Sequence, residues 1–433
     1  MNLRKHLTIL GAKGTAAAVR ILGKGQGTAL PGLVVEKFSN QLLEEFAGQI
    51  PCVILITGTN GKTTTQTAIT SILQNAGNKV LSNGSGSNMR RGLLSLFVKK
   101  SSLRGKIKFD QAVLEIEEAT MPRVARELKP KYIVVTNLYR DQLDAYGEIE
   151  RTRQMIRQAI EAAPQAEVII NADDPQLRDL TKGFPNKVFT YGISPEYLPD
   201  FSYEGKGGAG TKADYLADNI IINEDLGSKF KVDGEKFAFN SPGIYNVYNA
   251  LAAIVVARRQ GIKEKDIYEG LQLTKVAFGR GELISRNGIT YRLLLAKNPA
   301  GLNLVLELLA NVRKPKIILM LNDKIADGRD VSWIWDAEFE KLIKIAPAEI
   351  FIGGSRAAEL LLRLKYVYGS AREVGSGVYH LGDQAKAHLF TKVKDMVKFI
   401  EQTEPGAHFY VVPTYTAMLA LRKYLLGRSL DEN

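Results

Sequence analysis

The fold is decided by the stretch Gly58-Thr59-Asn60-Gly61-Lys62-Thr63-Thr64-Thr65, which follows the apolar run 53–56. A buried strand that ends in glycines, followed by a lysine and a threonine, is the pattern of a phosphate-binding loop. The glycines let backbone N–H groups point at phosphate oxygens, Lys62 can reach the β- and γ-phosphates, and the Thr63 hydroxyl can ligate Mg²⁺. A helix predicted from Thr64 to about Ala76 presents its positive end to the same anion. The stretch therefore predicts a nucleotide triphosphate site rather than a plain glycine turn.

Length and composition predict a globular chain with more than one domain. At 433 residues the chain is too long for a single ordinary core, so two or three domains are expected. Its composition, 45% hydrophobic and 24% charged, is typical of soluble globular proteins. No apolar run approaches the roughly 18 residues of a spanning helix, and the N-terminus lacks the pattern of a secretory signal. The sequence thus predicts a cytoplasmic protein.

Cysteine and histidine are scarce, which limits the metal chemistry. The single cysteine, Cys52, excludes an internal disulfide and a cysteine-cluster zinc site. It begins the strand before the phosphate loop, where we expect a packed, inert thiol. The four histidines show no metal-ligand spacing.

The net charge of +12, from 58 basic and 46 acidic residues, limits the choice of partners. Such a charge favours binding to phosphorylated substrates, to an anionic membrane surface or to nucleic acid. The excess is spread along the chain and no nucleic-acid motif accompanies it. We therefore expect an acidic or membrane-borne substrate and no nucleic acid, with a solvated basic surface that has no partner as the alternative.

The chain divides into three predicted parts. Residues 1–48 have amphipathic turns that fit short helices, docked on the next domain or lying on a membrane surface. In residues 49–285, short apolar runs alternate with helix-length segments, which predicts a mainly parallel sheet with helices on both faces. Residues 286–433 repeat this alternation as a smaller α/β domain. The predicted strands are 53–56, 80–81, 112–116, 133–136, 168–170, 317–321, 350–352 and 409–412.

Polar residues follow several of these strands. Glu115 lies within the apolar strand 112–116, where an unpaired carboxylate would be costly. Mg²⁺ between this carboxylate and the phosphates would supply a partner, and a core arginine is the alternative. Thr136-Asn137 and the NADDP sequence at 171–175 follow two further strands, where they fit either site loops or helix caps.

The regular alternation breaks at 193–240. A glycine-rich stretch and a hairpin turn at Asp233-Gly234 predict a small antiparallel excursion there. Beyond it, Asn246 and Asn249 lie on one face of a helix predicted over 245–261, where they can read an adenine edge or cap the helix. Arg280 stands between two glycines, so it can approach a phosphate or a carboxylate closely.

The segment 322–336 follows the predicted strand 317–321 and carries four aspartates and both tryptophans of the chain. A packed surface turn with solvated acids is the usual interpretation of such a segment. Its place beyond the carboxyl end of a strand, and its two aromatic residues, favour a docking or catalytic loop.

Five motifs, in order, resemble those of the Mur ligase family of ATP-dependent amide-bond-forming enzymes. They are GTNGKTTT at 58–65, the strand carboxylate Glu115, NADDP at 171–175, the pair Asn246/Asn249 and FGRGE at 278–282. Over most of residues 290–425 the chain also resembles the C-terminal domain of the MurT branch, the synthetase subunits of lipid II isoglutaminyl synthase. That likeness rests on AKNPAG at 296–301, DGRDVSWIWD at 327–336 and PTYTAM at 413–418.

The resemblance implies a Mur ligase-type P-loop ATPase domain followed by a smaller Rossmann-like domain, with ATP and Mg²⁺ as cofactors. It implies that ATP activates the α-carboxylate of D-glutamate in the lipid II stem peptide as an acyl phosphate. Ammonia from a GatD-like class I glutaminase subunit then gives D-isoglutamine. By similarity, Lys62 and Glu115 act in catalysis and Thr63 and Glu115 hold Mg²⁺. Asn246, Asn249 and Arg280 would contact the adenosine and its phosphates.

The resemblance also implies that Asp330 reaches across the interface to the partner subunit. There it would join the partner's cysteine and histidine as the third member of a catalytic triad. The residues alone leave Asp327 and Asp336 as alternatives.

The chain departs from the family in two respects. It lacks the cysteines of the zinc ribbon that many MurT proteins carry, so zinc is not expected. It also has no lysine between residues 148 and 171, where several Mur ligases carry a carbamylated lysine, so the ligands of a second Mg²⁺ stay open.

Two rival functions remain at this point. A free-standing ligase of the folylpolyglutamate type would add an amino acid instead of ammonia, although the DGRDVSWIWD loop does not favour it. A nucleotide-dependent switch or scaffold would use the phosphate loop without forming an amide. For the leading interpretation, the basic charge predicts contact with the inner face of the membrane that bears the substrate.

Overall fold

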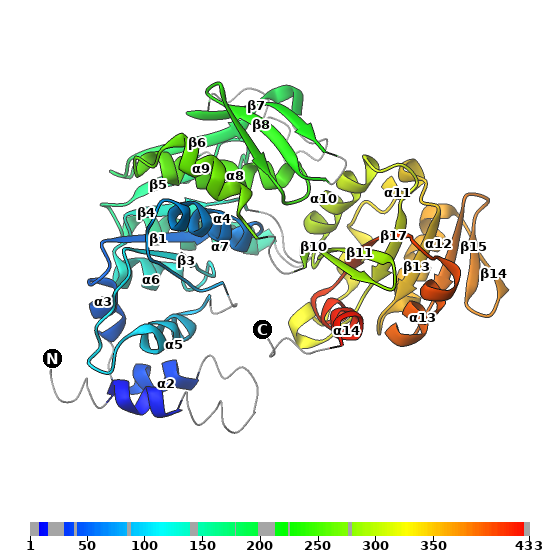
Figure 1. The fold of residues 1–433 in the computed structure, drawn as a ribbon, viewed down its shortest axis with the longest axis horizontal. Coiled ribbons are helices and arrows are strands. Elements are labelled where there is room, and N and C mark those ends of the chain that lie inside the picture. Colours follow the sequence, from blue (N-terminus) through cyan, green and yellow to red (C-terminus); the bar gives the residue numbers. More distant parts are fainter. Residues whose placement is uncertain are drawn as a thin grey trace.

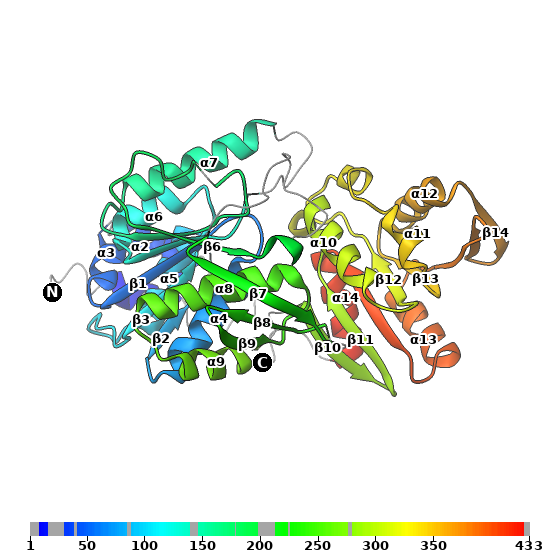
Figure 2. The same ribbon diagram turned by 90° about the horizontal axis from the view of Figure 1, so that it is seen from above.

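The computed structural model describes residues 8–15, 30–38, 41–84, 88–138, 146–177, 179–197, 213–223, 226–275 and 279–427. These form two lobes, each built on one β-sheet (Figure 1). The strand order is β2-β3-β1-β4-β5-β6-β7-β8-β9 in the first sheet and β10-β11-β17-β12-β13-β16-β15-β14 in the second. Figure 2 shows the two lobes side by side, with the hairpin β10–β11 on the side of the second lobe that faces the first.

The first sheet confirms the strands that the apolar runs predicted. From β2 to β7 in spatial order all neighbouring strands are parallel, whereas β8 and β9 are antiparallel. Its strands are β1 Cys52–Thr57, β2 Val80–Ser82, β3 Gln111–Glu115, β4 Tyr132–Val135, β5 Glu167–Asn171, β6 Val188–Ile193, β7 Tyr215–Ile222, β8 Ser228–Val232 and β9 Glu235–Phe239.

Helices cover both faces of this sheet, because successive residues of each buried strand point to opposite sides. Ile54 and Ile56 pack with α4, α8 and α9, whereas Val53 and Leu55 pack with α5, α6 and α7. The core that contains Val53 and Leu55 also includes Val35, Leu43 and Phe46. The described part of the N-terminal segment therefore docks on the first lobe. The helices are α2 Leu30–Phe38, α3 Leu42–Ala47, α4 Lys62–Asn75, α5 Arg90–Lys100, α6 Met121–Leu128, α7 Tyr146–Glu161, η1 Pro195–Tyr197, α8 Ile244–Arg259 and α9 Glu264–Gln272.

The described part of the segment 193–240 contains the antiparallel strands that the sequence predicted there. Strand β7 pairs with β6 in parallel, and β8 and β9 extend the same sheet. This pairing covers the edge of β6, which would otherwise present unpaired backbone groups. The hairpin turn is confirmed, since Val232 pairs with Glu235 and both Asp233 and Gly234 have positive φ. The glycine-rich stretch 205–210 lies outside the described residues.

The second lobe has the same layered plan on a smaller scale. Strands β11, β17, β12, β13 and β16 are parallel neighbours, and β10, β15 and β14 are antiparallel additions at the two edges. Its strands are β10 Arg280–Arg286, β11 Ile289–Leu294, β12 Lys316–Met320, β13 Glu349–Gly353, β14 Ala371–Gly375, β15 Val378–Leu381, β16 Ala385–Leu389 and β17 His408–Pro413. The sequence predicted β12, β13 and β17, and did not identify the hairpin β14–β15.

Helices flank both faces of the second sheet as well. Those on one side, α10 to α12, share a core with Leu319 and Ile352, and those on the other, α13 and α14, share a core with Ile318 and Phe351. The second sheet begins with β10 at Arg280, before the boundary predicted near residue 285. The helices are α10 Pro299–Ala310, η2 Ile325–Asp327, η3 Ser332–Trp335, α11 Lys341–Ile345, α12 Ala357–Tyr368, α13 Val393–Thr403 and α14 Tyr415–Leu426. Among the described helices, none has the length and apolarity that crossing a bilayer requires.

Candidate active site

The predicted phosphate loop joins the carboxyl end of β1 to the start of α4. Gly58 and Gly61 have φ values of 120° and 86°, which side chains other than glycine rarely adopt. A Cβ on Gly58 would lie 2.4 Å from the Thr136 hydroxyl, and one on Gly61 would lie 2.2 Å from Oδ1 of Asn249. The loop is therefore packed against its neighbours so closely that both positions require glycine.

The carboxyl end of β4 holds this loop in place. The backbone N–H of Asn60 donates to Oδ1 of Asn137 at 2.9 Å, and the Thr136 hydroxyl donates to the Asn60 carbonyl at 2.7 Å. The sequence left Thr136 and Asn137 open as site residues or caps. In the structure they support the loop from the end of β4, which lies beside β1 in the sheet.

Lys62 is the first residue of α4, and its ammonium group lies inside the loop. Nζ of Lys62 contacts the Gly58 carbonyl and lies 2.8 Å from Oε1 of Glu118. The same Glu118 oxygen accepts from the backbone N–H of Gly58 at 3.2 Å. Glu118 is a site residue that sequence analysis missed, although it stands in the acidic run that begins at Glu115.

Thr63 and Glu115, the two predicted magnesium ligands, lie together. The Thr63 hydroxyl donates to Oε2 of Glu115 at 2.7 Å, and Glu115 is buried at the end of β3. Asn83 fixes this end of the strand, because its side chain bonds both the N–H and the carbonyl of Glu115. One carboxylate and one hydroxyl are the oxygen ligands that Mg²⁺ takes when phosphates and water complete its shell. Within the described residues no cluster of three or more carboxylates, histidines or cysteines is spaced to hold a metal by itself.

A cavity of about 330 Å³ opens beside these groups, and both lobes line it. The first lobe contributes Lys62, Thr63, Glu115 and Glu118, and the second contributes Arg280 and Lys297. Burial lowers the pKa of Arg280 below its ordinary value, and the charge of nearby Glu115 opposes that shift. The cavity therefore brings cations from two lobes to the place where a triphosphate would lie between Lys62 and the magnesium ligands.

Lys297 is a second lining residue that sequence analysis did not assign to the site. It follows β11, and its neighbours Ala296 and Asn298 are both buried. Asn298 caps α10, since its Oδ1 accepts from the N–H of Gly301 at 2.7 Å, and Pro299 occupies the first turn. The backbone on both sides of Lys297 is thus fixed, and the AKNPAG sequence was the available signal.

Asn246 and Asn249 lie on α8 beneath the phosphate loop. Nδ2 of Asn249 donates to Oδ1 of Asn246 at 2.8 Å, and Oδ1 of Asn249 accepts from the Thr65 hydroxyl at 3.2 Å. Both side chains are buried, and neither lines the cavity described above. In this arrangement they support the loop, and their contact with a nucleotide stays a prediction. Thr64 is also buried, within the first turn of α4.

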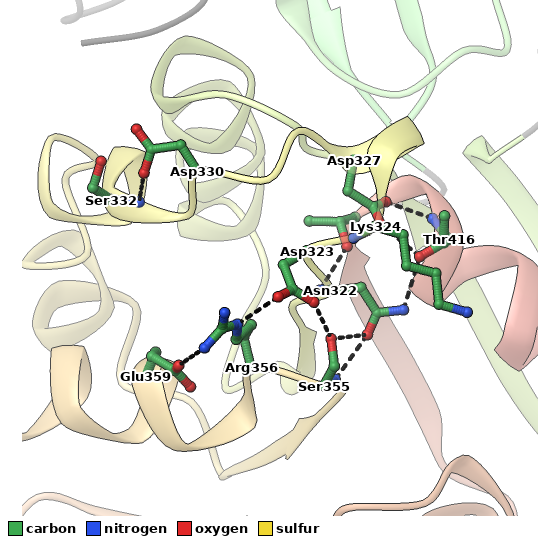
Figure 3. A network of polar contacts seen from close by, with 11 residues as sticks. Asn322, Asp323, Lys324, Asp327, Asp330, Ser332, Ser355, Arg356, Glu359 and Thr416 are labelled. Carbon is green, nitrogen blue, oxygen red and sulfur yellow. Dashed lines mark hydrogen bonds and ion pairs between the residues drawn. The ribbon is translucent and has the colours of Figure 1, made fainter.

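The three candidate aspartates of the 322–336 segment have different surroundings. Asp327 is buried and bonded to α14, whereas Asp330 and Asp336 are exposed. Oδ1 of Asp330 accepts from the N–H of Ser332 at 2.8 Å, and the Ser332 hydroxyl and N–H together lower the pKa of Asp330 below its ordinary value (Figure 3). Asp330 is therefore presented to solvent as a carboxylate.

An exposed aromatic pair includes Trp335, five residues after Asp330 in the sequence. The ring of Trp335 is 45% exposed and meets the ring of Tyr366 edge to face, with 5.4 Å between centroids. Tyr366 lies on α12 and is itself mostly exposed. Exposed aromatic residues beside a charged side chain are common at protein–protein interfaces.

Comparison with known proteins identifies the family. The model of the Mur ligase middle domain matches residues 56–257, and that of the MurT ligase C-terminal domain matches residues 295–418. The MurT subunit of lipid II isoglutaminyl synthase (glutamine-hydrolyzing) of Streptococcus pneumoniae is 32% identical, over 99% of this chain and 99% of that protein. The chain belongs to the MurT branch of the Mur ligase family.

Other relatives agree with this assignment. The MurT subunit of Staphylococcus aureus (strain COL) is 34% identical, over 84% of this chain and 88% of its own length. Among solved structures, MurF of Acinetobacter baumannii has a TM-score of 0.68 at 19% identity, over 92% of this chain and 81% of that one. A MurF ligase of Thermotoga maritima, in complex with ADP, has a TM-score of 0.63 at 15% identity, over 92% of this chain and 85% of that one. The predicted Mur ligase fold is thus confirmed for this MurT-branch chain.

Proposed function

We propose that this chain is the synthetase subunit of a lipid II isoglutaminyl synthase. It would use ATP to amidate the α-carboxylate of D-glutamate in the stem peptide, with ammonia from a GatD-like glutaminase subunit. Relatives whose names state a glutamine-hydrolysing lipid II isoglutaminyl synthase match 84% to 99% of the chain. The observation that carries the proposal is the presence of two separate sites: the two-lobe cavity at Lys62 and the exposed carboxylate of Asp330.

The reaction begins with two anions that repel each other. An oxygen of the substrate carboxylate attacks the γ-phosphorus of ATP, the bond to the β-phosphate oxygen breaks, and ADP leaves with that electron pair. Lys62 and the N–H groups of the phosphate loop offset the negative charge on the triphosphate, and Arg280 and Lys297 add cations from the opposite lobe. Thr63 and Glu115 would hold Mg²⁺, which screens the phosphate charge when bound.

Ammonia completes the amide. Its nitrogen attacks the acyl carbon, the carbon–oxygen bond to phosphate breaks, and inorganic phosphate leaves while the nitrogen loses a proton. The described residues around the cavity include no cysteine, so we assign glutamine hydrolysis to the partner subunit. The one cysteine, Cys52, is buried in β1, and burial raises the pKa of its thiol to about 11, which is unsuited to nucleophilic attack.

Asp330 is assigned to the partner's active site. Its exposure and its lowered pKa suit a carboxylate that orients an imidazole across an interface. Asp327 is unsuited, because both of its oxygens are bonded within this chain. We further propose that the complex works at the cytoplasmic membrane face, where the net charge of +12 favours anionic lipid.

The test uses purified protein, lipid II and MgATP with three nitrogen sources: ammonium, glutamine plus the glutaminase subunit, and free amino acids. The proposal expects D-isoglutamine and inorganic phosphate in equal amounts with the first two. Phosphate release that depends on a free amino acid would instead favour the amino-acid ligase. Nucleotide binding without any amide product would favour the switch or scaffold.

A further inference from the structure

The loop that carries Asp330 is tied to the rest of the second lobe at a point before Asp330. The chain leaves β12 after Met320, forms the short η2 helix, and then runs past Gly328 to Asp330 (Figure 3). Asp327 ends η2 and is buried, although Ala326 before it and Arg329 two residues after it are exposed. A buried carboxylate in an exposed loop needs bonding partners, because an unpaired charge is costly there.

Those partners are at the start of α14. Oδ1 of Asp327 accepts from the backbone N–H of Thr416 at 2.6 Å, and Oδ2 accepts from the Thr416 hydroxyl at 2.5 Å. Oδ2 also accepts from the N–H of Lys324 at 3.2 Å, which closes η2 on itself. The first N–H groups of a helix have no partner within the helix and favour a negative charge. Asp327 therefore bonds the loop to α14 in a strong, charge-assisted manner.

Asn322 makes a second tie to the same hydroxyl. Its Nδ2 donates to the Thr416 oxygen at 2.9 Å, and its backbone N–H donates to the Thr414 hydroxyl at 2.9 Å. Oδ1 of Asn322 accepts from the N–H of Ser355 at 2.8 Å, which adds the end of β13. The ends of β12, β13 and β17 are thus joined, and Figure 3 shows Asp330 projecting away from this network.

Beyond the tie, the path of the chain depends on where Asp327 is held. Gly328 has a φ of 84°, which lets the backbone turn sharply between Asp327 and Asp330. The bond from the Ser332 N–H to Asp330 is local, so it sets the direction of the carboxylate and not the place of the loop. The contact with α14 is consequently the nearest long-range restraint before Asp330 that the described contacts contain.

We propose that Asp327 is a positioning residue for the glutamine-dependent reaction, because its carboxylate fixes the loop from which Asp330 reaches the partner subunit. The proposal rests on the proposed function for the role of Asp330, but not for the role of Asp327 in holding the loop. A purely structural role, in which Asp327 only caps α14, would predict a loss of stability without a selective effect on glutamine use.

The first measurement needs neither substrate nor partner. Both tryptophans of the chain, Trp333 and Trp335, lie within five residues after Asp330, so fluorescence excited selectively at tryptophan reports on this segment. Asp327→Asn keeps the size of the side chain but replaces one acceptor oxygen by a donor. We expect red-shifted emission and stronger quenching by acrylamide. Asp395→Asn, a change at an exposed acid of α13 on the other face of the second sheet, is the matched control and should leave both unchanged.

A second variant guards against misfolding. Thr416→Ala removes the hydroxyl that Asp327 and Asn322 share and should change the emission in the same direction, whereas Thr416→Ser should restore the native spectrum. Emission of Asp327→Asn that is indistinguishable from the native protein would overturn the proposal.

The second measurement separates positioning from capping. We expect Asp327→Asn to lower glutamine-driven amidation about tenfold in the complex, since displacing a reactive group by about 1 Å can cost up to about a hundredfold, and to spare the ammonium-driven rate. In an Asp330→Asn background the same change should add nothing, because Asp327 acts through Asp330. Equal losses with both nitrogen sources, or a full additional loss in the double variant, would contradict the proposal. A native complex that makes no isoglutamine from glutamine would refute the proposed function instead, and the fluorescence would still decide how the loop is held.

Discussion

Lys62 and Glu115 show how single residues of opposite charge serve one cavity. Nζ of Lys62 donates to the carbonyls of Gly58 and Thr59, and Glu115 lies against the Thr63 hydroxyl. In the proposed function, Lys62 binds phosphate oxygens and Glu115 binds the metal. Glu118 contacts Lys62 as well, so the lysine is held in the loop and does not extend into solvent.

Removal of either charge should abolish the reaction with both nitrogen sources. For Lys62→Met and Glu115→Gln, which preserve side-chain size, we expect losses of about a hundredfold or more, the typical effect of removing one group that stabilises developing charge. The measurement is phosphate release from MgATP and lipid II with saturating ammonium. A variant that keeps near-native rates would show that its charge is not part of the site.

In the proposed function Asp330 serves the partner's active site, so its substitution should affect only the glutamine-driven reaction. Asp330→Asn keeps the hydrogen bond from Ser332 possible but removes the negative charge that would stabilise the partner's imidazolium. We expect glutamine-driven amidation to fall about a thousandfold or more while ammonium-driven amidation stays near native. An equal fall in both rates would show that Asp330 serves the ligase reaction.

At the scale of elements, the phosphate loop is shaped by what packs against it. Gly61 has no room for a side chain beside Asn249, whereas Gly77, beyond the other end of the same helix, has the same φ of 86° and open space around it. Alanine substitutions at these two glycines therefore separate the effect of backbone strain from the effect of a steric clash with Asn249.

Gly61→Ala should abolish ATP binding, because the added methyl group must displace Asn249 or the loop. Gly77→Ala carries the same strain of about 1–2 kcal/mol and should lower the free energy of unfolding by about that amount without affecting binding. Titration calorimetry with ATP and chemical denaturation of both variants provide the two readouts. Native affinity in Gly61→Ala would contradict the close packing of α8 beneath the loop.

The ends of β4 and β5 are joined by Asp174, which gives a pH prediction. Its oxygens accept from the N–H groups of Leu138 and Gln176, yet burial raises the pKa of Asp174 from 3.8 to about 7. The folded state therefore retains a proton that the unfolded state has lost, so the free energy of unfolding falls as the pH rises from about 4 to about 7. Asp174→Asn removes this titration, and denaturation midpoints measured across that range should then depend less on pH. An unchanged pH dependence would show that Asp174 is charged in the native protein.

At the scale of the whole molecule, the cavity belongs to neither lobe alone. Arg280 begins the second sheet, and its strand is fixed to the C-terminal helix by the ion pair between Glu282 and Arg422 at 2.9 Å. A change in how the lobes approach each other would move Arg280 and Lys297 relative to Lys62. We therefore expect nucleotide binding to depend on both lobes.

Arg280→Ala should weaken ATP binding about tenfold to a hundredfold, since a charge-assisted contact to phosphate contributes about 1.5–3 kcal/mol. Arg372→Ala, on the exposed hairpin strand β14, is the matched control and should bind ATP normally. Equal affinities for the Arg280 variant and the native protein would show that Arg280 does not contribute to nucleotide binding.

Sequence patterns predicted the parts of this molecule that local chemistry determines. The apolar runs predicted the parallel strands, and the glycine–lysine–threonine pattern predicted the loop at their carboxyl ends. Glu118 and Lys297 escaped notice because a charged residue in the sequence is usually solvated, and only the tertiary structure brings these two to one cavity. The choice between Asp327 and Asp330 likewise needed the position of α14, which lies far along the chain.

The central claim is that the chain transfers the γ-phosphoryl group of ATP to a substrate carboxylate before nitrogen attacks it. The most direct measurement uses lipid II whose D-glutamate α-carboxylate carries a heavy oxygen isotope, with MgATP and ammonium. The account predicts that this isotope appears in the inorganic phosphate released with each isoglutamine formed, and that Lys62→Met releases none. Isoglutamine formed together with phosphate free of the isotope would contradict it.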